Sequence, residues 1–364
     1  MKKKLRVALL FGGKSAEHEI SVISARNIFA AMDKNKYDVI AIGIDKQGRW
    51  FLDEGARLLS GTEPSKIEFH GRKHVTAVLP GESRSPMVRP STGAAFGRVD
   101  VVFPVLHGPF GEDGTIQGLL KLANVPFVGA GVLGSALGMD KDVMKRLLRD
   151  ARVPIAKFMA FEHADANTIR FATIKAALGL PLFVKPANLG SSVGISRVAN
   201  RNQFRLAITE AFRYDNKIVI EESIHGREIE CSVLGNQNPI ASLPGEIIVQ
   251  QDFYSYDAKY IDEKGARFEI PARLPKAVVQ KIRGLALRSY RVLGCEGMAR
   301  VDFFLRANGE VLVNEINTIP GFTKISMYPK MWQATGISYS RLIDRLIKLA
   351  LERSRREKRL RTSK

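Results

Sequence analysis

Cysteine is scarce in this sequence. The 364 residues include only two cysteines, Cys231 and Cys295, which lie far apart along the chain and match no metal-binding or redox spacing. The sequence therefore offers no cysteine motif for a metal ion or for thiol chemistry. Unpaired thiols are typical of a reducing compartment, so a cytoplasmic location is expected.

Long apolar runs are also missing. The chain begins like a secretory leader, with lysines before an apolar stretch, but that stretch covers only Val7 to Phe11 before glycines and charges intervene. No other run approaches the roughly 20 residues that a membrane-spanning helix needs. The sequence predicts neither a cleaved leader nor insertion into a membrane.

Two common nucleotide-binding motifs are absent. After the first predicted strand, Gly12 and Gly13 are followed by Lys14, Ser15 and Ala16, so the third spaced glycine of a dinucleotide fingerprint is lacking. A Walker loop ends in Gly-Lys-Ser/Thr and opens a helix, and no segment here has that order. Any nucleotide site must be built differently.

Acidic residues are few relative to basic ones. The formal net charge is +19, which raises the alternative of a protein that binds nucleic acid through its phosphates. Part of the excess lies in the segment Glu352 to Lys364, which is expected to fray into solvent after the preceding helix. No aromatic-interleaved basic patch, helix-turn-helix or zinc-finger spacing accompanies the charge, so specific nucleic-acid binding is not expected.

Strand and helix patterns alternate in the first third of the chain, which predicts an α/β fold with an open parallel sheet. The length implies two or three domains. We expect an N-terminal domain over 1–138 and two mixed α+β subdomains over 139–220 and 221–364. The loop-rich insert at 53–98 shows little periodicity.

Asn308 and Gly309 separate two apolar, β-rich runs and predict an antiparallel hairpin. If these two residues form the turn, Asp302 lies opposite Glu315 and Arg300 lies opposite Asn317, and all four share one face because side chains alternate along a strand. Two facing carboxylates repel unless a positive charge lies between them. The oxygen ligands of Asp302, Glu315 and Asn317 suit Mg²⁺.

Other segments carry polar groups at the ends of predicted strands. Lys185 precedes a Gly-Ser connection, 190–194, whose backbone N–H groups could cover phosphates. Glu17 stands in the first turn of a helix expected near Ser15 to Met32, where it could bind a substrate ammonium or merely complement the helix dipole. His107 follows a strand at the edge where such sheets bind ligands. Lys259 and Tyr260 lie in a polar loop that could close over a site.

Taken in order, these segments resemble the D-alanine–D-alanine ligases, which are ATP-grasp enzymes that make the terminal dipeptide of bacterial peptidoglycan. The likeness covers nearly the whole chain except the insert at 53–98 and the basic C-terminal tail. It is carried by FGGKSAEHEIS, LHGPFGEDGTIQG, SALGMDK, VKPANLGSSVG, DAKY, ARVDFF and NEINTIPGFT.

The resemblance implies an ATP-grasp fold in which the two later subdomains sandwich ATP. Two Mg²⁺ or Mn²⁺ ions held by Asp302, Glu315 and Asn317 would bridge the ATP phosphates. Relatives often carry lysine at the position of Glu222, so that residue is expected to act mainly through its backbone. The implied nucleotide-binding residues, from the phosphates to adenine and ribose, are Lys141, Lys185, Ser192, Glu221, Glu222, Ile224 and Glu228.

The resemblance also implies how two D-alanines bind. Glu17 would hold the first ammonium, and Ser191 and Tyr260 would link it to the closing loop. Arg300 and the N–H of Gly321 would face the developing oxyanion. The second substrate would be positioned by Lys259 and Ser326, with His107 nearby.

The implied reaction is ligation of two D-alanines through a D-alanyl phosphate, with a homodimer expected from the family. Ligases that join D-alanine to D-lactate or D-serine are the nearest alternative. Another ATP-grasp carboxylate–amine ligase and a basic nucleic-acid-binding protein are more distant ones.

Overall fold

The computed structural model describes residues 3–52, 59, 77–78, 87–88, 97–191, 193–249 and 266–361. The N-terminal part forms a sheet in the order β3-β2-β1-β6. In the insert, β4 (Ala77–Val78) and β5 (Met87–Val88) pair with each other in a separate two-stranded sheet. β1 (Leu5–Gly12) pairs in parallel with β2 (Tyr37–Ile44) and β6 (Val101–Val105), and β3 (Trp50–Phe51) adds an antiparallel edge. The predicted parallel sheet is confirmed.

The apolar run in β1 is continuous because both faces of this sheet are covered. Val7, Leu9 and Phe11 pack with α1 (His18–Ala31) on one face. The alternate residues Ala8 and Leu10 pack with α3 (Thr115–Leu122) on the other. This is the pattern of a parallel strand buried on both sides.

Two antiparallel sheets follow. After α4 (Val132–Met139) and α5 (Lys141–Asp150), the first has the order β7-β10-β8-β9. Its strands are β7 (Phe158–Glu162), β8 (Leu182–Pro186), β9 (Ser196–Val198) and β10 (Lys217–Glu222). A 3₁₀ segment (His163–Thr168), α6 (Phe171–Leu178) and α7 (Arg201–Ala211) belong to the same unit. Ile218 and Ile220 pack in the apolar cluster under these helices, so Lys185 and Glu221 point to the opposite face.

The second antiparallel sheet has the order β14-β13-β11-β15-β16, with β12 beside β11. Its strands are β11 (Arg227–Gly235), β12 (Ile240–Ala241), β13 (Gly245–Val249), β14 (Ala266–Glu269), β15 (Gly297–Leu305) and β16 (Val311–Asn317). Ile229, Val301 and Phe303 pack with α9 (Lys276–Val292) on one face. By alternation, Arg300 and Asp302 lie on the other face.

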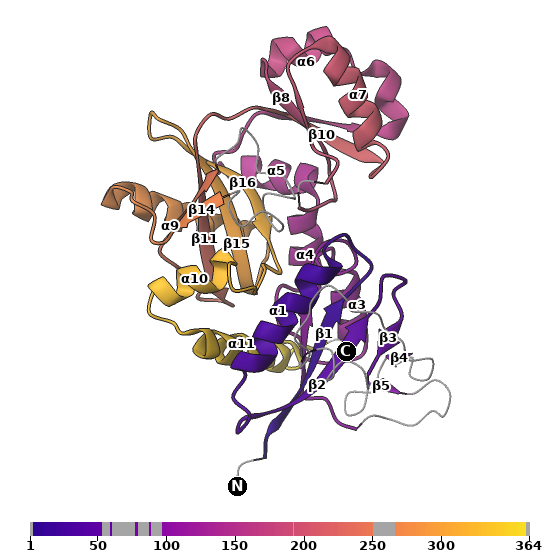
Figure 1. Ribbon diagram of the computed structural model, residues 1–364, viewed down its shortest axis with the longest axis vertical. Helices are drawn as coiled ribbons and strands as arrows, with labels where there is room; N and C mark the ends of the chain where they lie inside the picture. The colour runs from indigo at the N-terminus through magenta and orange to yellow at the C-terminus, as the bar shows by residue number, and fades with distance from the viewer. Residues whose placement is uncertain are drawn as a thin grey trace.

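The sheet of β7 to β10 lies at the top of Figure 1, the N-terminal sheet at the bottom, and the sheet of β11 to β16 between them. α10 (Met327–Ala334) and α11 (Tyr339–Glu357) end the chain. Among the described residues, no helix combines the length and the apolar character needed to cross a bilayer.

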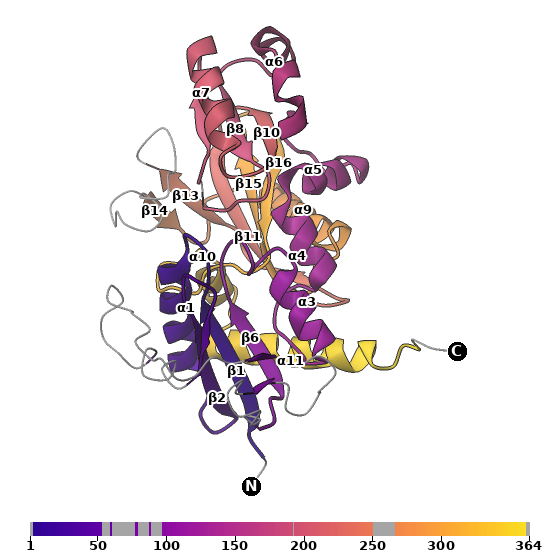
Figure 2. The same ribbon diagram turned by 90° about the vertical axis from the view of Figure 1, so that its right-hand side faces the viewer.

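The helix α11 returns to the N-terminal sheet, as Figures 1 and 2 show. Leu342, Ile343 and Leu346 share an apolar cluster with Val7 and Leu9. The two ends of the chain therefore build one core. The domain boundaries expected at 138 and 220 stay predictions.

The expectation that the tail frays from Glu352 is wrong for its first residues, because α11 continues to Glu357. Arg353 is 4% exposed. It donates to the carbonyl oxygen of Phe127 at 2.7 Å and to that of Gly129, and its guanidinium lies 4.4 Å from the centre of the Phe127 ring. Arg356 donates two bonds to Glu296. These tertiary contacts hold a segment that looks solvated by composition.

We expect Arg353→Met to lower the free energy of unfolding by about 2 to 4 kcal/mol, because two buried carbonyl groups lose their charged donor. The measurement is urea denaturation followed by circular dichroism. Arg355→Leu on the exposed side of the same helix is the control and should change stability by about 0.5 kcal/mol or less. Equal losses in the two variants would contradict the role of Arg353.

Candidate active site

The hairpin of β15 and β16 forms one wall of a pocket of about 150 Å³. Asp302 pairs with Glu315 and Arg300 pairs with Asn317, as predicted. The two-residue turn is wrong, however, because Leu305 pairs with Val311 and the connection is longer.

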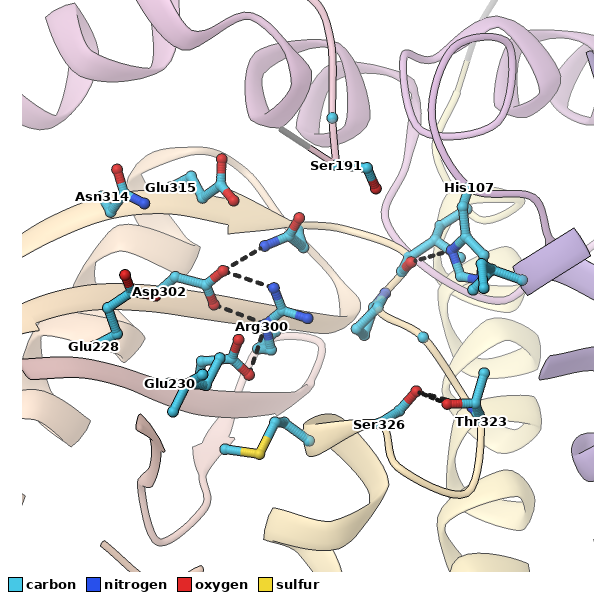
Figure 3. Close-up of a pocket in the computed structure, with 18 of the residues that line it drawn as sticks. His107, Ser191, Glu228, Glu230, Arg300, Asp302, Asn314, Glu315, Thr323 and Ser326 are labelled. Atoms are coloured by element: carbon cyan, nitrogen blue, oxygen red, sulfur yellow. Dashed lines mark hydrogen bonds and ion pairs between the residues drawn. The ribbon is translucent and has the colours of Figure 1, made fainter. Parts of the chain in front are cut away.

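A bulge restores the predicted register at the site. Asp302 faces Glu315 while Phe303 faces Val313, so Asn314 is the extra residue on β16. Figure 3 shows Asn314 and Glu315 side by side on the strand above Asp302, and Asn314 lines the pocket. Sequence reasoning missed Asn314 because an alternating pattern contains no signal for a bulge.

A half-buried cluster of charges centres on Arg300. Its guanidinium donates two bonds of 2.7 Å to Asp302 and lies 3.0 Å from Glu230 (Figure 3). Burial alone would lower the pKa of Arg300, but the carboxylates of Asp302 and Glu230 raise it well above its ordinary value. Arg300 is thus a permanent cation in the pocket, paired with Asp302 on its own strand and with Glu230 on the neighbouring strand β11. Glu230, on β11 opposite Asp302, was not singled out from the sequence.

The three predicted metal ligands lie at this wall. Asn317 donates to Asp302 at 3.0 Å, and Asp302, Glu315 and Asn317 all line the pocket. Their oxygen-rich donor set fits Mg²⁺ or Mn²⁺. The described ranges hold no group of three or more His, Cys, Asp or Glu side chains suited to a metal, so water and phosphate oxygens would have to supply further ligands.

A second buried cluster joins α5 to the sheet of β7 to β10. Glu221 on β10 lies 2.9 Å from Lys185 and 3.1 Å from Lys145, and Lys141 donates to the carbonyl oxygen of Leu189. Burial would raise the pKa of Glu221, but the two lysines lower it to about 2. Burial would lower the pKa of Lys185, and Glu221 raises it instead. Burial lowers the pKa of Lys141.

Lys145 is a residue that sequence reasoning missed. It is 1% exposed and lies one helical turn after Lys141. That i, i+4 spacing places both lysines on one face of α5 and was a signal that could have found it.

The remaining predicted nucleotide-binding residues lie along the strands β10 and β11. The side chain of Glu222 accepts from the backbone N–H of Lys157 at 2.8 Å and from Arg306 at 3.3 Å, so it is engaged within the protein. Ile224 is half-buried in the connection to β11. Glu228 lines the pocket.

Glu17 and Ser191 meet across the pocket. Gly12 ends β1 with φ of +90°, and a Cβ atom there would lie 2.1 Å from the carbonyl oxygen of Ile44, so the turn into α1 requires glycine. Glu17 precedes α1 and makes no side-chain cap bond to it. Its carboxylate instead accepts a hydrogen bond from the hydroxyl of Ser191, which weighs against a role in helix capping alone.

His107 and Glu112 hold the loop that follows β16. His107 Nδ1 lies 2.9 Å from the carbonyl oxygen of Ile319, and Glu112 accepts from the N–H of Ile319 at 3.1 Å and from that of Gly108 at 2.8 Å. Burial lowers the pKa of His107. Burial and the charge of Glu17 raise the pKa of Glu112 to about 8. Glu112 was not singled out from the sequence.

Gly321 and Ser326 lie further along the same loop. Ser326 accepts from the N–H of Thr323 at 2.9 Å, and a Cβ atom on Gly321 would lie 2.8 Å from the Ser326 hydroxyl oxygen. The loop can approach the Ser326 side chain this closely only with glycine. The predicted residues Ser192, Lys259 and Tyr260 lie outside the described residues.

The fold and the pocket define a class of protein. The segment between the parallel sheet and α1 supplies a carboxylate, and α5 with one antiparallel sheet supplies a group of lysines. The other antiparallel sheet supplies an arginine in an acidic hairpin. This is the arrangement of an ATP-grasp ligase, an enzyme that uses ATP to join a carboxylate to an amine.

Comparisons with known proteins define the family. The family described as "D-ala D-ala ligase N-terminus" matches residues 6–130, and the one described as "D-ala D-ala ligase C-terminus" matches residues 147–348. The chain is 52% identical over 365 residues to the D-alanine–D-alanine ligase of Oceanobacillus iheyensis, covering 100% of this chain and 99% of the relative. It is also 52% identical to D-alanine–D-alanine ligase A of Escherichia coli (strain K12), covering 99% and 100%.

Solved structures of related ligases superpose on this chain. A D-alanine–D-alanine ligase from Coxiella burnetii superposes with a TM-score of 0.87 at 41% identity, covering 98% of this chain and 96% of that one. A D-Ala:D-Ser ligase from Enterococcus faecalis superposes with a TM-score of 0.84 at 38% identity, covering 96% and 100%. The chain belongs to the D-alanine–D-alanine ligase family.

The buried cluster around Glu221 makes stability depend on acid. The pKa of Glu221 is about 2 in the folded protein and 4.5 ordinarily, so its contribution is present above pH 4.5 and is lost as the pH falls through 2. Glu221→Gln should remove this dependence and lower the free energy of unfolding at pH 7 by about 3 kcal/mol, because two lysines lose their buried partner.

The measurement is urea denaturation of both proteins from pH 7 down to the lowest pH at which they stay folded. Glu210→Gln is the control, because Glu210 pairs with Arg213 on the exposed surface of α7. If Glu221→Gln keeps the acid dependence of the parent protein, the ion pairs do not have this effect.

Proposed function

We propose that the residues of this pocket catalyse ATP-dependent ligation of two D-alanines to D-alanyl-D-alanine for peptidoglycan synthesis. Membership of the D-alanine–D-alanine ligase family carries the reaction. The observation that carries the site is the meeting of Glu17, Arg300 and the Asp302–Glu315 pair at one pocket, although they come from opposite ends of the chain.

In the proposed first step, the carboxylate of the first D-alanine attacks the γ-phosphorus of ATP, and ADP leaves with the electron pair of the broken P–O bond. Glu17, oriented by Ser191, binds the ammonium group of that D-alanine. Lys141 and Lys185 offset charge on the transferring phosphoryl group. Glu221, Glu222, Ile224 and Glu228 surround the nucleoside, and Ser192 belongs to the flap over the phosphates.

Asp302, Glu315 and Asn317 would hold two Mg²⁺ or Mn²⁺ ions, which supply charge neutralisation at the phosphates when bound. The role of Asp302 then has two parts. It orients Arg300 through the two hydrogen bonds seen in the structure, and it offers oxygen ligands to a cation.

In the second step, the neutral amine of the second D-alanine attacks the carbonyl carbon of D-alanyl phosphate. The carbonyl oxygen takes negative charge, and Arg300 and the N–H of Gly321 stabilise it. The C–N bond forms in this attack, and the attacking nitrogen then loses a proton, which leaves with the phosphate. Collapse of the tetrahedral intermediate breaks the bond from carbon to the phosphate oxygen, expels phosphate and leaves the peptide. Lys259, Ser326 and His107 position the second substrate, and the loop that carries Tyr260 closes over the intermediate and excludes water.

We further propose that the protein is a homodimer, which family membership supports. We also propose a cytoplasmic location, which the two free, buried cysteines Cys231 and Cys295 support. Burial raises the pKa of both thiols to about 12. Neither thiol is suited to act as a nucleophile.

Asp302→Asn should raise the Mg²⁺ concentration for half-maximal activity at least about tenfold, because it removes a negative ligand. Turnover is measured by phosphate release, and Mn²⁺ binding with ATP is measured by calorimetry. Asp38→Asn, the same change at an exposed site on β2, is the control. An unchanged Mg²⁺ dependence would remove Asp302 from the metal site.

We expect a peptide product rather than an ester at neutral pH. The amine must be neutral to attack, and a cation such as Lys259 disfavours its ammonium form. The test gives D-alanine, D-serine and D-lactate as acceptors at equal concentration from pH 6 to 9 and separates the products by chromatography. Predominant D-alanyl-D-lactate or D-alanyl-D-serine near pH 7 would contradict the acceptor assignment but not the ATP chemistry.

A further inference from the structure

The loop between β16 and α10 carries Gly321, and side chains from the N-terminal domain hold it on both sides. Glu112 accepts from the N–H of Ile319, and His107 contacts the carbonyl oxygen of Ile319. Beyond Gly321, Ser24 on α1 accepts from the N–H of Phe322 at 3.1 Å. The backbone on each side of Gly321 is therefore tied to a part of the chain about 200 to 300 residues away in sequence.

The hydrogen bonds that link Phe322, Ser24, His107 and Ile319 all run in one donor-to-acceptor direction. A carbonyl oxygen only accepts, so Nδ1 of His107 carries the proton that it donates to Ile319. In the neutral ring Nε2 then accepts, and it lies 3.3 Å from the hydroxyl of Ser24, which donates to it. The low pKa of His107, caused by burial, keeps the ring neutral and preserves this order.

The carbonyl oxygen of Phe322 is held as well. It accepts from the side-chain amide of Asn27 at 3.1 Å and from the hydroxyl of Tyr339 at 2.7 Å. Pro320 has no N–H. Within the described residues, no hydrogen bond takes up the N–H of Gly321. The loop is therefore fixed at the residues around one open donor.

Glu112 links the surroundings of Glu17 to the loop that carries Gly321. Its second oxygen holds the N–H of Gly108, and a Cβ atom on Gly108 would lie 3.0 Å from the Glu17 carboxylate. One side chain thus spans the backbone beside Glu17 and the backbone that leads to Gly321. It sets the distance between the proposed ammonium site of the first D-alanine and the proposed oxyanion donor.

We propose that Glu112 is a positioning residue for acyl transfer: by bridging Gly108 and Ile319 it places the Gly321 N–H at the carbonyl oxygen of D-alanyl phosphate. This rests on the proposed function of Glu17 and Gly321. Glu112 acts through the two backbone segments and touches no reacting atom. Its effect falls on the second step, because the oxyanion forms only when the amine attacks the carbonyl carbon and phosphate has yet to leave.

The energetics of Glu112 separate this role from a purely structural one. Burial and the nearby Glu17 disfavour its charged form and raise its pKa to about 8, although two backbone N–H groups act in the opposite direction. By linkage, a carboxyl whose pKa is raised in the folded protein lowers the free energy of unfolding at pH values above its ordinary pKa. Glu112→Gln keeps the shape, but its amide can accept only one of the two N–H bonds and presents donors to the other.

The experiment compares the two chemical steps in the full chain. Dipeptide formation gives kcat and the KM values. Positional isotope exchange in ATP labelled with ¹⁸O at the β,γ bridge, at D-alanine concentrations that fill only the first site, reports formation of the acyl phosphate. For Glu112→Gln we expect kcat to fall about 10- to 100-fold, which at its upper end reaches the effect of removing an oxyanion donor. Isotope exchange and the KM for the first D-alanine should change less than about threefold.

Asp113→Asn is the matched control. Asp113 is the next residue and also accepts two backbone N–H groups, those of Phe110 at 2.8 Å and Thr115 at 2.9 Å, but both lie within three residues of it in sequence. We expect it to keep both steps within about threefold of the parent. Glu112→Asp retains the carboxyl group with a shorter reach and provides a second variant with the same two readouts, each accompanied by a thermal unfolding scan.

The outcomes are distinct. A parallel fall of dipeptide formation and isotope exchange in Glu112→Gln, a raised KM for the first D-alanine with unchanged kcat, or an equal loss in Asp113→Asn would each overturn the positioning role. Unchanged kinetics in both Glu112 variants would do so as well. Failure of the proposed function would appear in the parent protein instead, as the absence of D-alanine-dependent isotope exchange and of dipeptide.

Discussion

A charge removed from water in this protein needs a partner, because the free energy of an unpaired buried ion is prohibitive. Two ion pairs at and near the candidate site meet this need with residues from different elements. Arg300 on β15 is paired with Glu230 on β11, and Glu221 on β10 with Lys145 on α5. The pairing joins strand to strand and helix to sheet, so the polar groups that the chemistry needs also hold the pocket walls together.

Tertiary contacts also connect the two ends of the chain. The N-terminal sheet covers its apolar residues with α11 from the C-terminus, and Arg353 on that helix is buried against the carbonyl groups of Phe127 and Gly129. The loop of Gly321, just before α10, lies against His107 and Glu112 from the N-terminal domain. The residues proposed for the first substrate and the proposed oxyanion donor thereby lie on surfaces that are joined by hydrogen bonds.

Not every buried group is placed for stability. Glu112 has a raised pKa because burial and Glu17 disfavour its charge, whereas Glu221 has a lowered pKa because two lysines favour it. The two carboxylates thus have opposite effects on stability at neutral pH. A destabilised carboxylate is typical of a functional site, where geometry matters more than stability. Glu221 by contrast holds together the lysines from which the proposed phosphate site is built.

The sequence by itself determined the local features of this protein. Alternation along the strands and the Asn308–Gly309 signal predicted a hairpin with Asp302 and Glu315 on one face, and the order of motifs indicated the family. Asp302 lies opposite Glu315 because a bulge offsets a turn that is longer than predicted. Only the tertiary structure decided where the bulge at Asn314 falls, that Glu230 is buried, that Glu112 bridges two backbone segments, and that the basic segment after Glu352 stays helical to Glu357. Local propensity and periodicity depend on neighbouring residues, whereas these features depend on burial against residues far away in sequence. Such long-range contacts leave no pattern in a single chain, apart from cases such as Lys145, where helical spacing from Lys141 carries the signal.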